Sequence, residues 1–337
     1  MSHFVIVCNS GSSSFSFYGL SDSGRLEHAG DMPFPGVGEA SGACPMTLSS
    51  DGKTLYLAFR GSPQEVLSFA VDGKARQLQL LGRAPLADSM AHIAVDSSGH
   101  YLLSASYGGG KVSINPIGAD GVAGAPSDTL TPAGKMHCCI PVPESDVFFA
   151  TSLAADAIYR FRIGAGGKLE QQEEVAKVPA GSGARHLVLH PNGRFAYAVT
   201  ELSSLAGVFA LEGSTLSPEP VQTLSILPEQ WQGEPWAADI RITPDGRFLY
   251  ASDRKANSIA CFAVDAASGR LTRAGVTFGA PWPRSMNITP DGRFLLALGE
   301  NSDLIDVFGI DAQTGALDKR HTLPTGKGPS WVEMVGG

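Results

Sequence analysis

The stretch Thr289-Pro290-Asp291-Gly292-Arg293-Phe294-Leu295-Leu296 has two close copies elsewhere in the chain. They read Thr243-Pro244-Asp245-Gly246-Arg247-Phe248-Leu249-Tyr250 and His190-Pro191-Asn192-Gly193-Arg194-Phe195-Ala196-Tyr197. Weaker copies surround Gly52 and Gly99, and a degenerate copy has Ser145 in place of the glycine. From Gly52 to Gly292 the successive spacings are 47, 46, 48, 53 and 46 residues. A repeat of this length, with an Asp-Gly or Asn-Gly turn between two apolar runs, is typical of one β-sheet blade per repeat.

Each repeat contains four expected strands in the same order. An apolar strand leads into the turn, a second apolar strand leaves it, and an alternating strand such as residues 259–265 follows. A glycine turn then leads to a polar edge strand such as residues 270–273. The inner strands are almost continuously apolar, as expected where neighbouring blades cover both faces of a sheet. We expect the outermost strand to be short and polar because it forms an exposed sheet edge.

The two ends of the chain predict how the ring of blades closes. Six turns are visible, and the N-terminus starts directly with a second-strand pattern at residues 4–8. Residues 330–335 have the first-strand pattern with no second strand after them. The last segment therefore supplies the strand that the first blade lacks. The sequence predicts an all-β, seven-bladed β-propeller in which residues 1–337 form one domain.

Bulk properties narrow the expected partners and location. The formal net charge is −8 at pH 7 and the pI is near 5.5. A nucleic acid or an anionic membrane would require a basic face, so neither is an expected partner. No segment resembles a membrane-spanning helix or a signal peptide. With an odd five cysteines, we expect a reduced cytoplasmic protein without disulfides. The expected assembly is a monomer or a weak homo-oligomer.

The hairpin geometry predicts where a functional site lies. The first two strands of a blade are the arms of one hairpin, so the residues before the first arm and after the second lie together, opposite the turn. We call this end of the ring the mouth. Before the first arms stand Met90-Ala91-His92, Met136-His137, Ala184-Arg185-His186, Trp236-Ala237-Ala238-Asp239 and Pro283-Arg284. After the second arms stand Phe59-Arg60, Ser106-Tyr107, Thr151-Ser152, Thr200-Glu201, Asp253-Arg254-Lys255 and Gly299-Glu300.

Four of these positions carry the strongest functional signal. Arg185 and Glu201 are 16 residues apart but flank one hairpin, so they are expected to meet. The neighbouring blades add His137 and Arg254. Cations around one carboxylate and an imidazole suit an anionic substrate attacked by an activated water. The alternative is a set of ordinary loop charges that pair with one another, but four convergent positions favour a functional site.

Other motifs point away from phosphate-loop, metal and serine chemistry. Gly108, Gly109 and Gly110 precede Lys111 but lack the strand–loop–helix context of a phosphate loop, so we expect a tight turn with Lys111 as an anion contact. His137-Cys138-Cys139 lacks metal-ligand spacing, which favours buried thiols and no metal. There is no Gly-x-Ser-x-Gly elbow to supply a serine nucleophile.

Several aromatic residues near the mouth leave alternatives open. Trp231, Trp236 and Trp282 fit blade packing and a sugar-stacking platform equally well. His186 points either towards the central axis or into its blade, because neighbours on a strand alternate. His92 is a similar candidate for a site residue at the mouth, with a weaker signal than His186.

At these residues the chain resembles the seven-bladed lactonase family, typified by bacterial cycloisomerase-type 6-phosphogluconolactonases and including fungal carboxy-muconate lactonising enzymes. The resemblance covers essentially the whole chain. Its most specific pieces are Tyr107-Gly108-Gly109-Gly110-Lys111-Val112-Ser113, Ala184-Arg185-His186-Leu187, Glu201-Leu202-Ser203-Ser204, Leu249-Tyr250-Ala251-Ser252-Asp253-Arg254 and Pro283-Arg284. By this resemblance, His137, Arg185, Glu201 and Arg254 fall on positions implicated in the family's active site.

The chain departs from the family pattern at three places. The family's His-x-His retains its second histidine as His137, while Lys135 replaces the first. The family's Asp-x-Gly becomes Ser152-Leu153-Ala154, although the later Asp156 is kept, and Ser106 replaces an asparagine. These departures leave the fold and general chemistry in place and leave the particular lactone open.

Together these observations predict a lactonase acting on a small anionic sugar-acid lactone, without a metal or organic cofactor. Glu201 is the expected general base, His137 a base or proton shuttle, and Arg185 the group over the oxyanion. The expected substrate-binding residues are Arg254, Arg284, Lys111, His186 and Tyr107. Lactones of non-phosphorylated aldonic or aldaric acids and a carboxy-muconate cycloisomerase reaction are the alternatives. A non-catalytic interaction platform is a further one, but the Gly-His…Trp-Asp signature of such platforms is missing.

Overall fold

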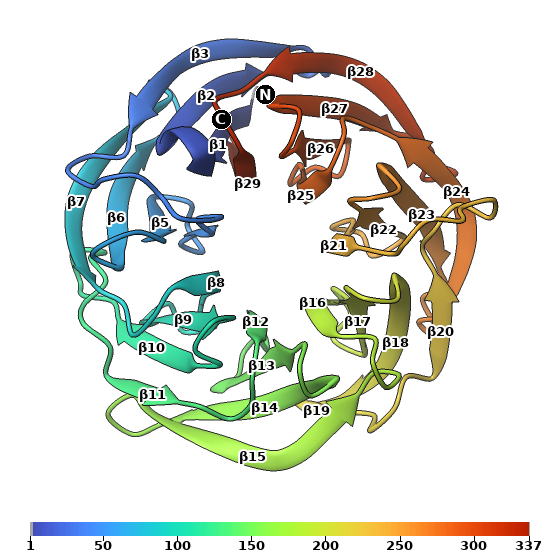
Figure 1. Ribbon diagram of the computed structural model, residues 1–337, viewed down its shortest axis with the longest axis horizontal. Helices are drawn as coiled ribbons and strands as arrows, with labels where there is room; N and C mark the ends of the chain where they lie inside the picture. Colours follow the sequence, from blue (N-terminus) through green and yellow to red (C-terminus); the bar gives the residue numbers. More distant parts are fainter. Residues whose placement is uncertain (1–2, 337) are drawn as a thin grey trace.

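Seven antiparallel sheets stand around a common axis as the blades of a propeller (Figure 1). The computed structural model describes residues 3–336, with the backbone alone for residues 172–174. The seven-bladed all-β fold expected from the repeat is confirmed. Within residues 3–336 the helical structure is one short 3-10 helix, η1 (Ser10–Ser12), and no helix there is long and apolar enough to span a membrane.

Each blade runs from an inner strand near the axis to an outer strand at the circumference (Figure 1). The innermost strands are β29 (Pro329–Gly336), β4 (Met46–Leu48), β8 (Met90–Val95), β12 (Met136–Pro141), β16 (Ala184–Leu189), β21 (Ala237–Ile242) and β25 (Pro283–Ile288). The second strands are β1 (His3–Asn9), β5 (Thr54–Phe59), β9 (Tyr101–Ser106), β13 (Val147–Ser152), β17 (Phe195–Thr200), β22 (Phe248–Asp253) and β26 (Phe294–Gly299). The third strands are β2 (Ser14–Leu20), β6 (Glu65–Asp72), β10 (Val112–Pro116), β14 (Ala157–Gly164), β18 (Leu205–Glu212), β23 (Ser258–Val264) and β27 (Leu304–Ile310).

The outer strands differ from the expectation of short edges. They are β3 (Leu26–Pro33), β7 (Gln77–Pro85), β11 (Asp128–Leu130), β15 (Lys168–Lys177), β20 (Gln222–Ser225), β24 (Leu271–Phe278) and β28 (Leu317–Pro324), with β19 (Thr215–Leu216) as an extra strand on β18. Five of them have 8 to 10 residues, because the circumference is wider than the axis. In these five blades a register shift interrupts the pairing of the outer strand with the third strand. Such bulges protect an exposed edge without shortening it.

The ring closes as the two chain ends predict. Strand β29 pairs antiparallel with β1, with Val332 opposite Val7, so the last strand is the innermost strand of the first blade. The N- and C-termini consequently lie side by side (Figure 1).

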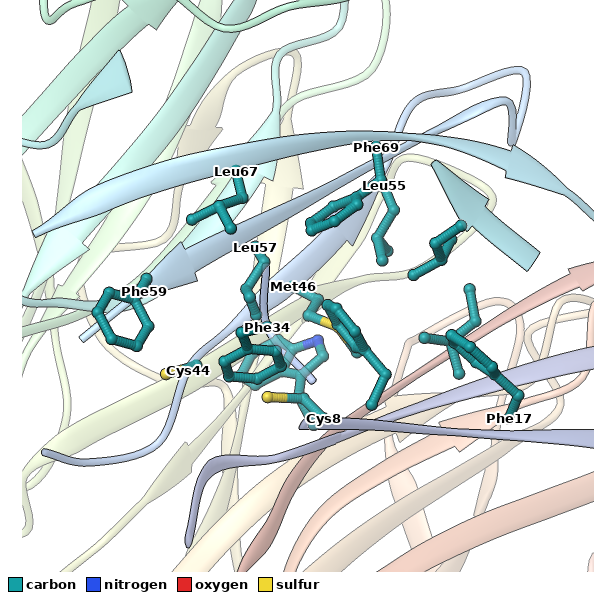
Figure 2. Close-up of a cluster of buried hydrophobic side chains, with 14 of the residues drawn as sticks. Cys8, Phe17, Phe34, Cys44, Met46, Leu55, Leu57, Phe59, Leu67 and Phe69 are labelled. Atoms are coloured by element: carbon teal, nitrogen blue, oxygen red, sulfur yellow. The ribbon is translucent and has the colours of Figure 1, made fainter. Parts of the chain in front are cut away.

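The hydrophobic core lies between adjacent blades. Figure 2 shows the cluster between the first two blades, which includes Phe17 from β2 and Phe69 and Leu55 from β6 and β5. Across the two blades, the Phe15 ring of β2 lies 5.4 Å from the Phe69 ring of β6. Six further clusters of the same kind lie among the described residues. Because each sheet is covered on both faces by its neighbours, every blade holds the next in a fixed position. This rigid ring positions the loops at the mouth.

The repeated Asp-Gly turns close the inner hairpins at the end opposite the mouth. In one of them the Thr243 hydroxyl donates to an Asp245 carboxylate oxygen at 2.6 Å, and the Gly246 N–H donates to the Thr243 carbonyl at 2.8 Å. Gly246 has a φ of +75°, and Gly193, at the same position of the preceding repeat, has +69°. Side chains avoid this left-handed region, which explains the recurring glycine.

These two glycines provide a matched test of the turn. A Cβ on Gly193 would meet nothing within 4 Å, whereas one on Gly246 would lie 2.5 Å from the His190 ring. We therefore expect Gly193→Ala to lower the free energy of unfolding by about 1–2 kcal/mol through backbone strain alone. Gly246→Ala should lower it by clearly more, as measured by urea unfolding. Equal losses in the two variants would contradict the contribution of His190.

Candidate active site

Every inner strand that carries an expected site residue has a β-bulge near the mouth. The register shifts occur in β8, β12, β16, β21 and β25, and in β29 against β1. The extra residue is His137 in β12, Arg185 in β16 and Arg284 in β25. A bulge turns a side chain out of the regular alternation of a strand. It therefore lets successive residues, such as Arg185 and His186, both leave the blade.

Arg185 and Glu201 form a buried ion pair at the mouth. The Arg185 Nε donates to Glu201 Oε2 at 2.8 Å, and its Nη1 donates to the Ala238 carbonyl. Both residues are at least nine-tenths buried. Backbone hydrogen bonds fix the carboxylate's position, because the Glu201 N–H donates to the Gly183 carbonyl at 2.8 Å and the Ala237 N–H donates to the Glu201 carbonyl at 3.0 Å. The pair predicted from the two arms of one hairpin is thus present.

Arg254 joins this pair from the neighbouring blade. Its Nη2 lies 3.4 Å from Glu201 Oε2 and donates to the Ala237 carbonyl at 2.9 Å. Its guanidinium lies over the rings of Trp236 and Trp282, at 5.6 and 5.9 Å from their centroids. Stacking on two indoles restricts a guanidinium to one plane. Trp236 and Trp282 thus pack against a site residue, whereas Trp231 lies between β20 and β21 in a separate pocket with Arg273.

Three guanidinium groups at the mouth keep donors without a partner. Among residues 3–336, Arg185 Nη2 and Arg254 Nη1 have no hydrogen-bond partner, and Arg284 has a single contact, 3.4 Å from Nη1 to Glu300 Oε2. Burial, followed by repulsion from Arg185, lowers the pKa of Arg254 to about 9, so it remains a cation at neutral pH. Burial likewise lowers the pKa of Arg185, with Glu201 opposing this shift. Three cations stand beside two carboxylates, Glu201 and Glu300. Their unpaired guanidinium donors form a site for an anion.

Tyr107 and Lys111 occupy different surroundings. The Tyr107 ring lies edge-on to the His137 ring at 6.0 Å, with the Lys135 ammonium 5.5 Å from the Tyr107 centroid. Lys111 instead donates to the Ala87 carbonyl at 3.1 Å and lies 3.7 Å from Asp88. No contact in the described part of the chain joins Lys111 to the arginines. The expected tight turn is present, since Gly110 has a φ of +63° and a Cβ there would lie 2.5 Å from a backbone oxygen.

Below the mouth, side chains from different blades meet on the central axis. His92 from β8, His186 from β16 and Trp331 from β29 lie within 5.4 to 6.3 Å of one another, measured between ring centroids. Their blades are not adjacent in the ring, so these rings project towards the axis. His137 lies 5.1 Å from His186. Of the two orientations open for His186, the structure therefore has the one towards the axis.

His186 makes one strong contact in this axial group. Its Nδ1 lies 2.9 Å from Asp239 Oδ1, and the other carboxylate oxygen of Asp239 accepts from Arg241 Nη2 at 3.2 Å. Burial lowers the pKa of His186 to about 4 and also lowers the pKa values of His92 and His137, so all three imidazoles are neutral at pH 7. This level of the axis carries neutral bases below a cationic mouth.

The five cysteines are buried and unpaired. Burial raises the pKa of the Cys138 thiol to about 12 and also raises that of Cys139, so the expected buried thiols are confirmed. No group of three or more His, Cys, Asp or Glu side chains within residues 3–336 is arranged to hold a metal ion.

Comparison with known proteins identifies the family. Residues 33–334 match the family described as lactonase, seven-bladed β-propeller. The chain belongs to this lactonase family. A 6-phosphogluconolactonase of Pectobacterium carotovorum subsp. carotovorum is 37% identical over 277 residues, 82% of this chain and 81% of the relative. One of Cronobacter sakazakii is 38% identical over 247 residues, 71% of this chain and 72% of the relative. The solved structure of a Pseudomonas aeruginosa periplasmic gluconolactonase has a TM-score of 0.88 and 28% identity, with 100% of this chain and 99% of that one covered.

In this lactonase-family propeller the mouth residues follow a fixed spacing from the turn glycines. Arg185 stands eight residues before Gly193 and Glu201 eight after it, while Arg254 stands eight after Gly246. Arg284 likewise stands eight residues before Gly292, and His137 stands eight residues before Ser145, which replaces the turn glycine. His92 and His186 of the axial group, and the Asp239 that contacts His186, stand seven residues before the turn position. Asp239, which sequence reasoning placed at the mouth without a role, is detectable by this count.

Proposed function

We propose that this protein hydrolyses the lactone of a phosphorylated sugar acid, with 6-phosphogluconolactone as its substrate. The observation that carries the proposal is the convergence of Arg185, Glu201 and Arg254 at one mouth, with hydrogen-bond donors left over for an anion. The names of the relatives from Pectobacterium and Cronobacter support the same substrate.

Each residue at the mouth has a separate role in the proposed reaction. Glu201 Oε1, which has no hydrogen-bond partner among the described residues, takes a proton from water as the water oxygen attacks the lactone carbonyl. Arg185 Nη2 stabilises the negative charge that develops on the carbonyl oxygen. The bond from the carbonyl carbon to the ring oxygen then breaks. His137 passes the proton to that oxygen, and the products are a hydroxyl group and a carboxylic acid that ionises.

Arg254 and Arg284 bind the anionic group of the substrate through charge-assisted hydrogen bonds. Arg284 is the more accessible of the two, with 22% of its side chain exposed. His186 and Tyr107 flank His137 below and beside the substrate. Lys111, tied to Asp88, would contribute only by leaving that ion pair. No step requires a metal or an organic cofactor.

The test is a panel of lactones followed with a pH indicator. The proposal predicts the highest kcat/KM for 6-phosphogluconolactone, ahead of gluconolactone, aldarate lactones and a carboxy-muconate lactone. The similarity to a solved gluconolactonase across 100% of this chain favours the unphosphorylated lactone as a second candidate. Faster turnover of gluconolactone would replace the proposed substrate with that one, and no turnover of any lactone would refute the proposal.

A substitution of Arg284, the accessible arginine, tests whether this residue binds the phosphate of the substrate. We expect Arg284→Gln to raise KM for 6-phosphogluconolactone by at least about tenfold, the loss of one charge-assisted contact. KM for neutral gluconolactone should change much less. Arg293→Gln, at the turn end of the ring beside Asp291, is the matched control. A rise of equal size for both lactones would contradict a contact between Arg284 and the phosphate.

We also infer that the enzyme works in the cytoplasm as one domain of residues 1–337, either as a monomer or as a weak homo-oligomer. Five free, buried cysteines suit a reducing compartment. Cell fractionation, a single unfolding transition and light scattering at several protein concentrations test these three statements.

A further inference from the structure

Two buried imidazole nitrogens below the mouth have no hydrogen-bond partner. They are Nε2 of His186 and Nδ1 of His137, and these residues are only 5% and 6% exposed. The two rings lie 5.1 Å apart between centroids, tilted by 59°. Buried polar atoms are almost always hydrogen-bonded. This separation allows a direct N–H···N bond after a small rotation of one ring, or a single bridging water.

Asp239 determines which nitrogen of His186 carries the proton. Its Oδ1 lies 2.9 Å from His186 Nδ1, while its Oδ2 accepts from the Met286 N–H at 2.8 Å and from Arg241. Burial alone would raise the pKa of Asp239, but Arg241 and the His186 hydrogen bond lower it overall. An ionised carboxylate only accepts hydrogen bonds, so His186 Nδ1 must donate.

His186 Nε2 must then accept a hydrogen bond. With its pKa lowered to about 4 by burial, His186 holds a single proton at neutral pH, and that proton is on Nδ1. The Trp331 indole N–H is already used, since it donates to Glu333 Oε1 at 2.9 Å. The ring of His92 is farther away, at 5.6 Å, and its Nδ1 faces the Cys139 sulfur at 3.6 Å. His137 Nδ1–H is therefore the donor that the geometry favours.

We propose that Asp239 and His186 are positioning residues that hold His137 as the tautomer with its proton on Nδ1. The lone pair of His137 is then on Nε2. Because Nδ1 is the ring nitrogen that is buried without a partner, we take Nε2 to be the one that faces the mouth. At Nε2 the imidazole accepts the proton that Glu201 took from water and gives it to the leaving ring oxygen. The catalytic part of this inference rests on the proposed function, whereas the tautomer exists without any substrate.

The surroundings of the two imidazoles favour their neutral forms. The titratable and charged groups that face them are Arg185, Asp239, Arg241, Arg284, His92 and Tyr107. Of these, Asp239 raises the pKa of His186 but does not offset the effect of burial. Burial lowers the pKa of His137, and Arg185 is the next largest cause. His137 therefore gains its second proton only below the ordinary value of 6.5. We expect the acid limb of kcat/KM to lie below that pH.

Asp239→Asn should reverse the whole chain of hydrogen bonds. The Oδ2 position faces the Met286 N–H and two Arg241 nitrogens, whereas Oδ1 faces the Ile240 N–H at 2.9 Å besides His186. Three donors outweigh one, so the amide oxygen of Asn is expected at the Oδ2 position, with loss of the Ile240 hydrogen bond. The amide NH₂ then points to His186 Nδ1 and donates to it. His186 must carry its proton on Nε2, and His137 must accept at Nδ1. The lone pair that faced the mouth is replaced by an N–H.

Long-range ¹H–¹⁵N correlation spectra of histidine-labelled protein measure these tautomers directly. We expect His137 and His186 to carry their protons on Nδ1 in the wild-type protein and on Nε2 in Asp239→Asn. His92→Gln should leave both on Nδ1. A wild-type His137 protonated on Nε2 would overturn the inference, even if Asp239→Asn failed to fold. The inference would also be overturned if His92→Gln changed the His137 tautomer and Asp239→Asn left it unchanged.

Activity provides the second readout. Asp239→Asn should lower kcat for the lactone by about tenfold with little change in KM. The loss is moderate because His137 and Glu201 both take part in proton transfer in the proposed mechanism. Asp239→Glu should recover part of this loss. Asp306→Asn is the matched control, since Asp306 is also buried and accepts from Ala280, Thr322 and Lys319. It lies on β27, the third strand of its blade, and contacts neither imidazole. Equal losses in the two Asn variants would overturn the inference. If no lactone is turned over, only the proposed function fails, and the spectra still decide the tautomer.

Discussion

Glu201→Gln is expected to lower kcat for lactone opening by about 10²- to 10⁴-fold, the usual contribution of a positioned general base. The amide should orient its oxygen towards Arg185 Nε and Arg254 Nη2, which contact Oε2 at 2.8 and 3.4 Å in the wild-type protein. The NH₂ group then occupies the position of Oε1. A hydrogen-bond donor thus replaces the proton acceptor at the position where the proposed mechanism activates water, while the size of the side chain is preserved.

Steady-state kinetics with 6-phosphogluconolactone would check this, together with thermal unfolding. Thermal unfolding is needed because Arg185 is only 2% exposed and loses a charged partner in the variant. Glu300→Gln is the matched control, since Glu300 stands eight residues after its turn glycine, as Glu201 does, and pairs with Arg284 at 3.4 Å. It should alter KM more than kcat. If Glu300→Gln lowered kcat as much as Glu201→Gln, Glu201 would not be the base.

The fold was largely predictable because one turn motif repeats. Gly193, Gly246 and Gly292 mark hairpins at nearly constant spacing, and the unmatched patterns at the two chain ends predict the shared first blade. The meeting of Arg185 with Glu201 follows from the same hairpin logic. It needs no knowledge of side-chain packing, since both residues leave one hairpin at the same end.

The axial group was less predictable for a physical reason. Strict alternation along β16 places Arg185 and His186 on opposite faces. The bulge at Arg185 instead lets both leave the blade, Arg185 at the mouth and His186 towards the axis. The sequence shows no residue type that marks this bulge. Likewise, Lys111 has the composition of an anion contact, but its partner Asp88 comes from a loop whose position depends on the packing of two blades. The length of the outer strands was not predictable either, because it depends on the circumference of the complete ring and not on a single repeat.

Arg185→Met is expected to lower kcat by about 10²- to 10³-fold, the loss typical of removing one donor to an oxyanion. Charge on the carbonyl oxygen develops only in the transition state, so KM should change little. Arg185 suits this role because Glu201 and the Ala238 carbonyl hold its Nε and Nη1, which leaves Nη2 as a donor in a fixed direction. Methionine has a similar length and fills the buried space without charge.

Two comparisons separate this role from a structural one. Arg185→Lys keeps the charge but loses the fixed fork of donors, so it should recover only part of the loss. Arg254→Met should mainly raise KM, because in the proposed mechanism Arg254 binds the substrate anion in both the ground state and the transition state. The Arg254 variant removes a guanidinium of comparable burial, 4% exposed against 2%, and therefore controls for lost stability. If both Met variants raised KM and left kcat unchanged, Arg185 would bind substrate and would not stabilise the oxyanion.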